Sequence, residues 1–145
     1  MNEKNRQDLE EMICGSKTTI GQEVRVDKIR PDGKHIRVDV YHVSREVTND
    51  YHTFYSFLEE LPAKVEMGAL TPPIIVRGIP ENPGLTGVLV IDYSHITFHA
   101  FAEKKRINFD LYSCKDFDSE VVIQHAEKYF GVSRDNMIIK EDSRF

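Results

Sequence analysis

The sequence is poor in cysteine, and the two cysteines that it has do not form a recognisable site. Cys14 and Cys114 lie far apart in the 145-residue chain, with no CxxC pattern and no Cys/His spacing of the kind that binds zinc. We therefore expect neither a disulfide framework nor a metal ion.

Long apolar runs are missing as well. The chain begins with the polar residues 1–6, no apolar segment of a secretion signal follows them, and no stretch approaches the ~20 apolar residues that a membrane-spanning helix requires. These absences predict a soluble, cytoplasmic protein with no membrane partner.

An excess of positive charge is also absent. The formal net charge is -5, and the lysines and arginines are scattered among acidic residues instead of lying along one basic stripe. Because proteins that bind nucleic acid need such a stripe to attract the phosphate backbone, we expect no nucleic-acid partner.

The residues that are present suffice for one compact domain. A chain of this length with 40% apolar residues can bury one core but not two. Residues 1–32 are predicted to be an N-terminal extension and residues 33–145 a single domain. Within the extension, Leu9, Met12 and Ile13 indicate a weak helix, and Val24, Val26 and Ile29 indicate an edge strand.

The spacing of apolar residues predicts the order of elements in the domain. Strands are expected at 36–41, 74–77, 88–91, 95–101, 107–113 and 137–139. One helix is expected from a cap at Ser44 until Pro62 ends or kinks it, and a second from a cap at Asp118 or Ser119 to Gly131. This order predicts an α+β fold: a two-layer sandwich in which helices cover one face of a mostly antiparallel sheet.

Polar residues gather on one face of two neighbouring strands. Along 95–101 the odd-numbered residues His95, Thr97, His99 and Phe101 point away from the expected core, and along 107–113 the even-numbered residues do so. If these strands form a hairpin, matching faces and a short turn set Phe101 opposite Asn108, His99 opposite Asp110 and His95 opposite Cys114. Ser94, His95, His99, Asp110 and Cys114 would then share one polar surface.

From the residues alone, this surface has more than one interpretation. Antiparallel sheets often expose one polar face to solvent, and a lone cysteine such as Cys114 is often an inert small apolar residue. A Ser/His/acid hydrolase is a further possibility, although Ser94 lacks the flanking glycines of a nucleophile elbow.

Three separate segments decide between these interpretations by resemblance. Residues 85–91, 94–99 and 110–114 resemble, in order and spacing, the prokaryotic S-adenosylmethionine decarboxylase proenzyme family, and the likeness extends over about residues 33–140. The resemblance implies a pyruvoyl-dependent decarboxylase that acts on a small amino-acid-type substrate and supplies the aminopropyl donor for spermidine synthesis. It also implies a homodimer of cleaved protomers in which two sheets stack.

The same resemblance implies roles for particular residues. Ser94 would attack the preceding carbonyl to form an ester, and β-elimination would cut the chain between Tyr93 and Ser94 and leave a pyruvoyl group derived from Ser94. The ketone of this group would accept the electrons released as carbon dioxide leaves, so no separate cofactor is needed. His99 would take the proton lost in the elimination, Cys114 would protonate the decarboxylated carbon, and Thr86 stands where the family has a serine that aids processing.

The chain departs from the family pattern near the expected substrate. Tyr93 replaces a glutamate, Phe101-Ala102-Glu103 replaces Trp-Pro-Glu, and the loop at 77–84 has no aromatic residue to stack on adenine. The residues expected to contact substrate are Tyr93, His95, Phe101, Glu103 and Asp110.

These departures leave two alternatives to S-adenosylmethionine turnover. The first is an arginine or ornithine decarboxylase of the same fold, with Asp39, Glu81 or Asp110 holding a cationic side chain. If Tyr41, Phe101 or Tyr112 instead supplies the missing adenine-stacking ring, S-adenosylmethionine remains the expected substrate. The second is a non-catalytic regulatory homologue, which the joint retention of Ser94, His99 and Cys114 disfavours.

Overall fold

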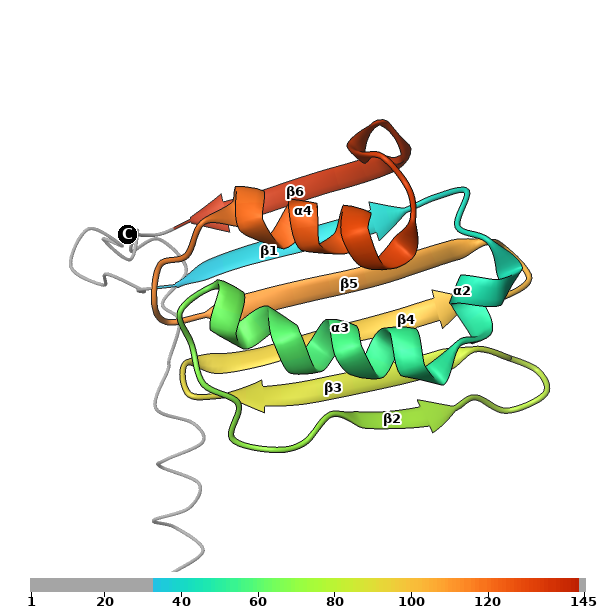
Figure 1. The fold of residues 1–145 in the computed structure, drawn as a ribbon, viewed down its shortest axis with the longest axis horizontal. Helices are drawn as coiled ribbons and strands as arrows, with labels where there is room; N and C mark the ends of the chain where they lie inside the picture. The colour runs from blue at the N-terminus through green and yellow to red at the C-terminus, as the bar shows by residue number, and fades with distance from the viewer. Residues whose placement is uncertain (1–32, 144–145) are drawn as a thin grey trace, which may run out of the picture. The chain divides into compact units, whose positions relative to one another are not determined.

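The computed structural model describes residues 33–143, which form a six-stranded sheet with helices on one face (Figure 1). In chain order the elements are β1 (Lys34–Val40), α2 (Arg45–Asn49), α3 (Tyr51–Lys64), β2 (Ile74–Arg77), β3 (Leu85–Ile91), β4 (Ser94–Phe101), β5 (Arg106–Ser113), α4 (Ser119–Phe130), the short 3-10 helix η2 (Arg134–Asn136) and β6 (Met137–Ser143). The strand order is β2-β3-β4-β5-β1-β6, and each neighbouring pair is antiparallel. The predicted helix and edge strand within residues 1–32 lie outside the described residues.

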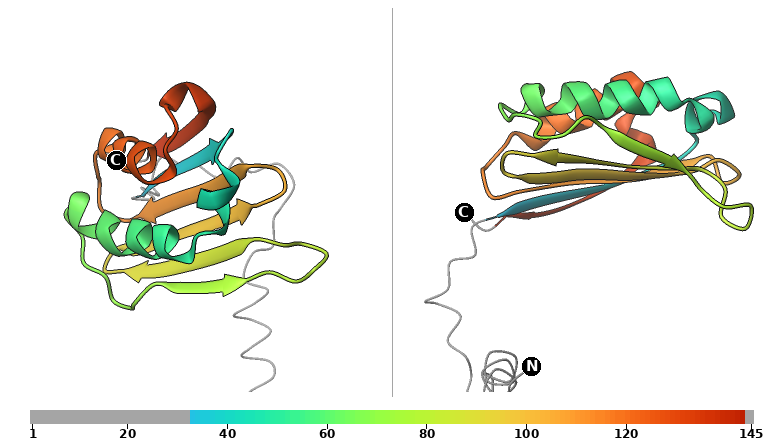
Figure 2. Two further views of the ribbon diagram at one scale, coloured as in Figure 1. Left: turned by 45° about the vertical axis from the view of Figure 1, so that its right-hand side comes forward. Right: turned by 90° about the horizontal axis from the view of Figure 1, so that it is seen from below.

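The edge-on view in Figure 2 shows the two layers of the predicted sandwich, with α3 and α4 on the same side of the sheet. The predicted α+β class is therefore confirmed. In the part of the chain that the structure describes, no helix has the length and apolar character needed to cross a membrane.

The core lies between the helices and one face of the sheet. Alternate residues of β1 and β5 are buried and face each other across the strand pair, as in the pairs Ile36–Leu111 and Val38–Phe109. Phe54 of α3 stacks on Phe98 of β4, with ring centroids 4.2 Å apart. Since side chains alternate along a strand, the intervening residues point to the other face, which no described element covers (Figure 2). We call this second face the open face.

The first predicted helix is wrong in its extent. The chain instead forms two helices: the Ser44 hydroxyl caps α2 by accepting from the Val47 N–H, and the Asp50 carboxylate caps α3 by accepting from the His52 N–H. The apolar spacing continues across Asp50, so periodicity alone did not reveal the break. Pro62 does not end α3 but lies buried inside its last turn, and the helix runs on to Lys64.

The second helix agrees with its predicted capping residues. The Asp118 carboxylate accepts from the Glu120 N–H at 2.9 Å, which selects Asp118 over Ser119 as the cap. Gly131 follows the helix with φ 66°, the left-handed conformation that commonly ends helices and suits a residue without a Cβ.

The predicted hairpin register was wrong by two residues. In the structure His99 lies opposite Asn108, Asp110 opposite Thr97, and His95 opposite Tyr112. A slip of two residues keeps every side chain on its face, so the apolar pattern cannot distinguish the two registers. The turn decides instead: Phe101 pairs with Arg106, the Lys104 N–H donates to the Phe101 carbonyl at 3.1 Å, and Lys105 adopts φ 49°.

Candidate active site

The turn between β3 and β4 holds Ser94 in a strained backbone conformation. Asp92 anchors this turn on Gly68, because its main-chain N–H donates to the Gly68 carbonyl and its carboxylate accepts from the Gly68 N–H, both at 2.9 Å. Ser94 begins β4 with φ 151°. Residues other than glycine rarely adopt such a value, and it costs on the order of 1–3 kcal/mol.

Three reactive groups meet at the peptide bond between Tyr93 and Ser94. The Ser94 hydroxyl oxygen lies 3.1 Å from Nδ1 of His95. The Tyr93 carbonyl accepts a hydrogen bond of 3.0 Å from the main-chain N–H of Cys114, which follows β5 and is exposed. A nucleophile, an imidazole and a polarised carbonyl are the groups that an acyl shift from nitrogen to oxygen requires.

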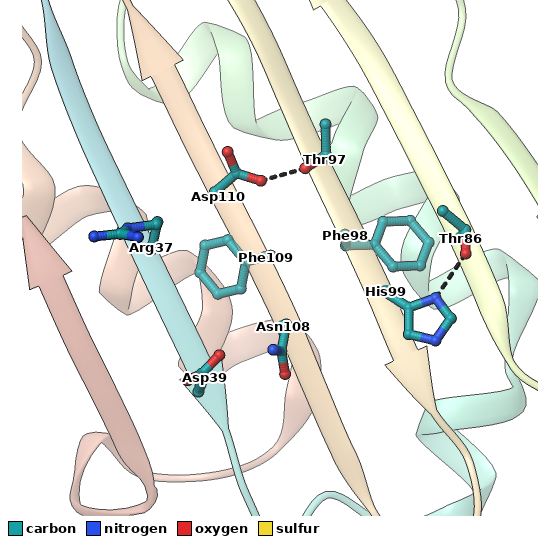
Figure 3. Close-up of a pocket in the computed structure, with 9 residues that line it drawn as sticks. All are labelled: Arg37, Asp39, Thr86, Thr97, Phe98, His99, Asn108, Phe109 and Asp110. Atoms are coloured by element: carbon teal, nitrogen blue, oxygen red, sulfur yellow. Dashed lines mark hydrogen bonds between the residues drawn. The ribbon is translucent and has the colours of Figure 1, made fainter. Parts of the chain in front are cut away.

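Asp110 lies at the centre of a polar cluster on the open face. One carboxylate oxygen, Oδ2, is 2.7 Å from Nε2 of His35 and 3.9 Å from Nε2 of His95. The other oxygen, Oδ1, accepts a hydrogen bond from the Thr97 hydroxyl (Figure 3). The Tyr112 ring lies beside both imidazoles, with centroid separations of 5.7 Å to His35 and 6.0 Å to His95. The cluster thus links β1, β4 and β5 to the Ser94 hydroxyl.

A second cluster is formed by Thr86 of β3 and His99 of β4. The Thr86 hydroxyl oxygen is 2.7 Å from Nδ1 of His99 (Figure 3). Burial lowers the pKa of His99, and the nearby positive charge of Arg106 lowers this pKa further. Among residues 33–143, no group hydrogen-bonds to the buried Nε2 of His99. A neutral imidazole with one free nitrogen is suited to accept a proton.

The two clusters occupy different places along β4. Ser94 is the first residue of the strand and His99 lies five positions further, which at the usual rise corresponds to about 16 Å. The structure therefore brings Ser94, His95, Asp110 and Cys114 towards one end of the hairpin and Thr86, His99 and Phe101 towards the other. The residues predicted to share one polar surface therefore fall into two separate groups.

A hollow on the open face runs beside both clusters. Its volume is about 440 Å³, and charged and polar side chains from β1, β3, β4 and β5 line it together with Phe98 and Phe109 (Figure 3). The polar lining residues are Arg37, Asp39, Thr86, Thr97, His99, Asn108 and Asp110. The hollow has room for a small molecule.

The remaining predicted substrate contacts lie outside this hollow. Glu103, on the β4–β5 turn, pairs with Arg45 at 2.6 Å. Phe101 packs between His99 and Arg106, whose guanidinium carbon is 4.3 Å from the ring centroid. A smaller hollow of about 280 Å³ includes Phe101, Glu103 and Glu81 in its lining. Tyr93 is half-exposed at the β3–β4 turn.

Sequence reasoning did not name His35, Arg37 or Asn108 as candidate site residues. The alternation along β1 and β5 puts them on the same face as the predicted residues, which was a usable signal. What the pattern does not give is that β1 lies next to β5, because the two strands are far apart in the chain. Only this pairing brings His35 to Asp110.

The fold and the chain both match one family. The family model described as S-adenosylmethionine decarboxylase matches residues 34–143, which include all the described helices and strands. The chain is 28% identical to the S-adenosylmethionine decarboxylase proenzyme of Thermotoga maritima over 115 residues, which are 78% of this chain and 85% of the relative. It is 31% identical to that of Archaeoglobus fulgidus over 84 residues, 58% of this chain and 72% of the relative.

A solved structure shows the same fold. The crystal structure of the adenosylmethionine decarboxylase from Aquifex aeolicus superposes with a TM-score of 0.64 at 22% sequence identity. The superposition covers 77% of this chain and 89% of that one. At this identity the likeness establishes the sandwich fold.

Proposed function

Because the chain belongs to the S-adenosylmethionine decarboxylase family, we propose that it decarboxylates S-adenosylmethionine after cutting itself between Tyr93 and Ser94. The observation that carries this proposal is the arrangement at that peptide bond. Ser94 is strained, its hydroxyl contacts His95, and the carbonyl before it is held by the Cys114 N–H. The name proenzyme, given to the relatives, is in keeping with such processing.

The first step is the attack of the Ser94 oxygen on the Tyr93 carbonyl carbon. The C–N bond breaks, the Ser94 nitrogen takes up the proton, and an ester replaces the amide. The Cys114 N–H stabilises the negative charge that develops on the Tyr93 oxygen. The strain at Ser94, on the order of 1–3 kcal/mol, raises the energy of the intact peptide and so favours the shift.

The second step is an elimination. A base removes the Cα proton of Ser94, the Cβ–Oγ bond breaks, and Tyr93 leaves as a carboxylate. The dehydroalanine that remains takes up water and releases ammonia, which gives the pyruvoyl group. We assign the base to His99, whose Nδ1–H can donate to Thr86 while Nε2 accepts the proton.

The distance between Ser94 and His99 favours a homodimer. Within one chain, about 16 Å of strand separates them, too far for a direct proton transfer. If two open faces stack, the partner's His99 can serve Ser94. Exposed apolar residues on the open face, among them Ile74, Val76 and Val90, would then be buried as well.

When formed, the pyruvoyl group supplies the electrophilic ketone that a substrate amine can attack. The other groups of the site belong to the chain itself. In the hollow, the carboxylates of Asp39 and Asp110 complement a positively charged substrate, and Arg37 can pair with its carboxylate. Cys114 lies next to the Tyr93 carbonyl with an exposed thiol, from which it can protonate the substrate carbon.

The test is the release of carbon dioxide from carboxyl-labelled S-adenosylmethionine, arginine and ornithine, each offered to the purified protein and to its Ser94→Ala variant. We expect release from S-adenosylmethionine by the wild type and none by the variant. Release from arginine or ornithine alone would overturn the substrate assignment. An uncut chain without turnover of any of the three would instead identify a non-catalytic homologue.

A further inference from the structure

The hydroxyl of Ser94 contacts His95, whereas His99 is hydrogen-bonded to Thr86. The attack on the Tyr93 carbonyl requires the hydroxyl to give up its proton, and His95 is the imidazole in contact with it. We propose that His95, supported by Asp110 and His35, is the base for ester formation, and that His99 serves the elimination alone. This assignment rests on the proposed self-cleavage.

Asp110 gives His95 the orientation that such a base needs. Its Oδ2 lies 3.9 Å from Nε2 of His95, and a carboxylate there favours the tautomer with the proton on Nε2. Nδ1 is then left as the acceptor for the Ser94 hydroxyl. The same carboxylate stabilises the positive charge that the ring gains on taking the proton, as an aspartate does in serine hydrolases.

His35 and Thr97 fix the carboxylate in turn. The Thr97 hydroxyl, directly across the β4–β5 pair, donates to Oδ1 of Asp110, and Nε2 of His35 lies 2.7 Å from Oδ2. Within residues 33–143, neither side chain hydrogen-bonds to Ser94, so both are positioning residues. In the uncut chain, the open-face cluster on β1, β4 and β5 therefore holds His95 against Ser94.

All protons and electrons of the ester-forming step come from the chain itself. The Ser94 proton moves to Nδ1 of His95 while the Oγ–C bond forms, and the carbonyl electron pair moves to the oxygen held by the Cys114 N–H. The C–N bond then breaks as His95 returns the proton to the Ser94 nitrogen. The product is an ester with a free amine on Ser94, and no further reactant is consumed.

Hydroxylamine separates the two histidines, because it cuts esters but not amides. We expect freshly produced His99→Gln protein to accumulate the ester, so that hydroxylamine splits it into a fragment ending in the hydroxamate of Tyr93 and a fragment beginning with the amine of Ser94. We expect His95→Gln, and the double variant with His99→Gln, to give neither these fragments nor a pyruvoyl chain. His52→Gln, on the outer surface of α3, is the matched control and should process at the wild-type rate.

Rates and chemical rescue distinguish a base from a structural residue. Removing a general base slows its step about 100-fold or more, so ester formation in the His99→Gln background should fall by at least that factor when His95 becomes Ala. Free imidazole should restore part of the rate if His95 acts as a base. If the substitution instead caused a folding defect, free imidazole would not restore the rate. Asp110→Asn, a near-isosteric change, should slow ester formation about tenfold or more in the same His99→Gln background. The midpoint of thermal unfolding and the mass of the dimer should remain those of the His99→Gln protein.

The outcomes separate the inference from the function on which it rests. Ester accumulation in His95→Gln, or wild-type rates in both His95→Gln and Asp110→Asn, would overturn the role of His95 while leaving self-cleavage intact. A wild-type chain that is never cut at Tyr93–Ser94 would overturn the proposed function itself.

Discussion

At the scale of single residues, the Thr86–His99 contact sets the tautomer of the proposed elimination base. With Nδ1–H donating to Thr86, Nε2 is the nitrogen that accepts the proton. Thr86→Val keeps the side-chain shape but removes the acceptor, and the loss of such a hydrogen bond slows the elimination roughly tenfold. Thr86→Ser keeps the hydroxyl and should stay close to wild type. Time-resolved mass spectrometry of ester and cut chain measures both, and equal rates for the two variants would contradict the role of Thr86.

Arg106 gives a residue-level prediction of pH dependence. Burial is the main cause of the lowered pKa of His99, and the positive charge of Arg106 lowers this pKa further. Arg106→Gln removes that charge, so the His99 pKa rises towards its ordinary value and a larger fraction of the imidazole is protonated in mild acid. Because only the neutral ring accepts a proton, the acid limb of the elimination rate should move to higher pH. Lys64→Gln, on the helix side of the sheet, is the control, and coincident profiles for the two variants would refute the prediction.

The separate residues of the site were predictable to different degrees. Thr86, Ser94, His99 and Cys114 were predicted as site residues because they lie in short segments that resemble a family. The contact of His35 with Asp110 could not be predicted in this way, since it depends on a strand pairing between distant parts of the chain.

At the scale of the elements, side-chain alternation predicted faces but not register. The buried and open faces of β4 and β5 follow directly from the period of two, which a slip of two residues preserves. The break between α2 and α3 was missed for a related reason. Asp50 caps a new helix without disturbing the apolar spacing, so the local hydrogen bonds and not the pattern determine where α2 ends.

The pairing of β3 with β4 predicts a steric constraint at Gly87. A Cβ on Gly87 would lie 2.2 Å from the ring of Phe98, its cross-strand partner, and this ring is itself stacked on Phe54. Gly87→Ala should therefore reduce the free energy of unfolding by about 1–3 kcal/mol. Urea denaturation in the uncut Ser94→Ala background measures the change. Gly68→Ala, where the nearest atom is a carboxylate oxygen at 3.4 Å, should be much milder, and equal effects at the two glycines would speak against the constraint.

The contact between α3 and α4 contributes a pH dependence of stability. His125 of α4 is buried, its Nε2–H donates to the Phe57 carbonyl of α3 at 2.9 Å, and burial lowers its pKa from the ordinary value of 6.5. At pH values between the pKa of His125 in the folded chain and its pKa in the unfolded chain, the unfolded chain binds more protons. The free energy of unfolding therefore decreases as the pH falls below about 6.5. His99 acts in the same direction.

Replacing His125 by Gln keeps a hydrogen-bond donor for the Phe57 carbonyl but removes the titratable imidazole. We expect the loss of unfolding free energy on acidification to be smaller in His125→Gln than in the parent, both in the Ser94→Ala background, although His99 preserves part of the slope. Urea titrations across the mildly acidic range provide the measurement. An unchanged slope would show that His125 titrates alike in the folded and unfolded chains.

At the scale of the whole molecule, the sequence predicted the layered fold because helix caps, strand alternation and element order all agree on it. The proposed division of the reacting groups between two protomers was not predictable from the pattern. We infer it from the positions of Ser94 and His99 along one strand, together with an open face that no described element covers.

A mixed dimer tests this division directly. His99→Gln and Ser94→Ala chains, carrying different tags, should each remain uncut when produced alone. When they are produced together, the His99→Gln chain should be cut, because its Ser94 can use the His99 of the partner subunit. A His99→Gln chain that stays uncut in purified mixed dimers would show that His99 acts within its own chain.

The central claim is self-cleavage at the strained residue Ser94, and intact mass spectrometry of the purified wild type beside Ser94→Ala tests it most directly. We predict two wild-type fragments that meet between Tyr93 and Ser94, whose summed mass equals the uncut chain plus water minus ammonia, and a single chain for the variant. An uncut wild-type chain, or a fragment beginning with an unmodified serine amine, would contradict the account.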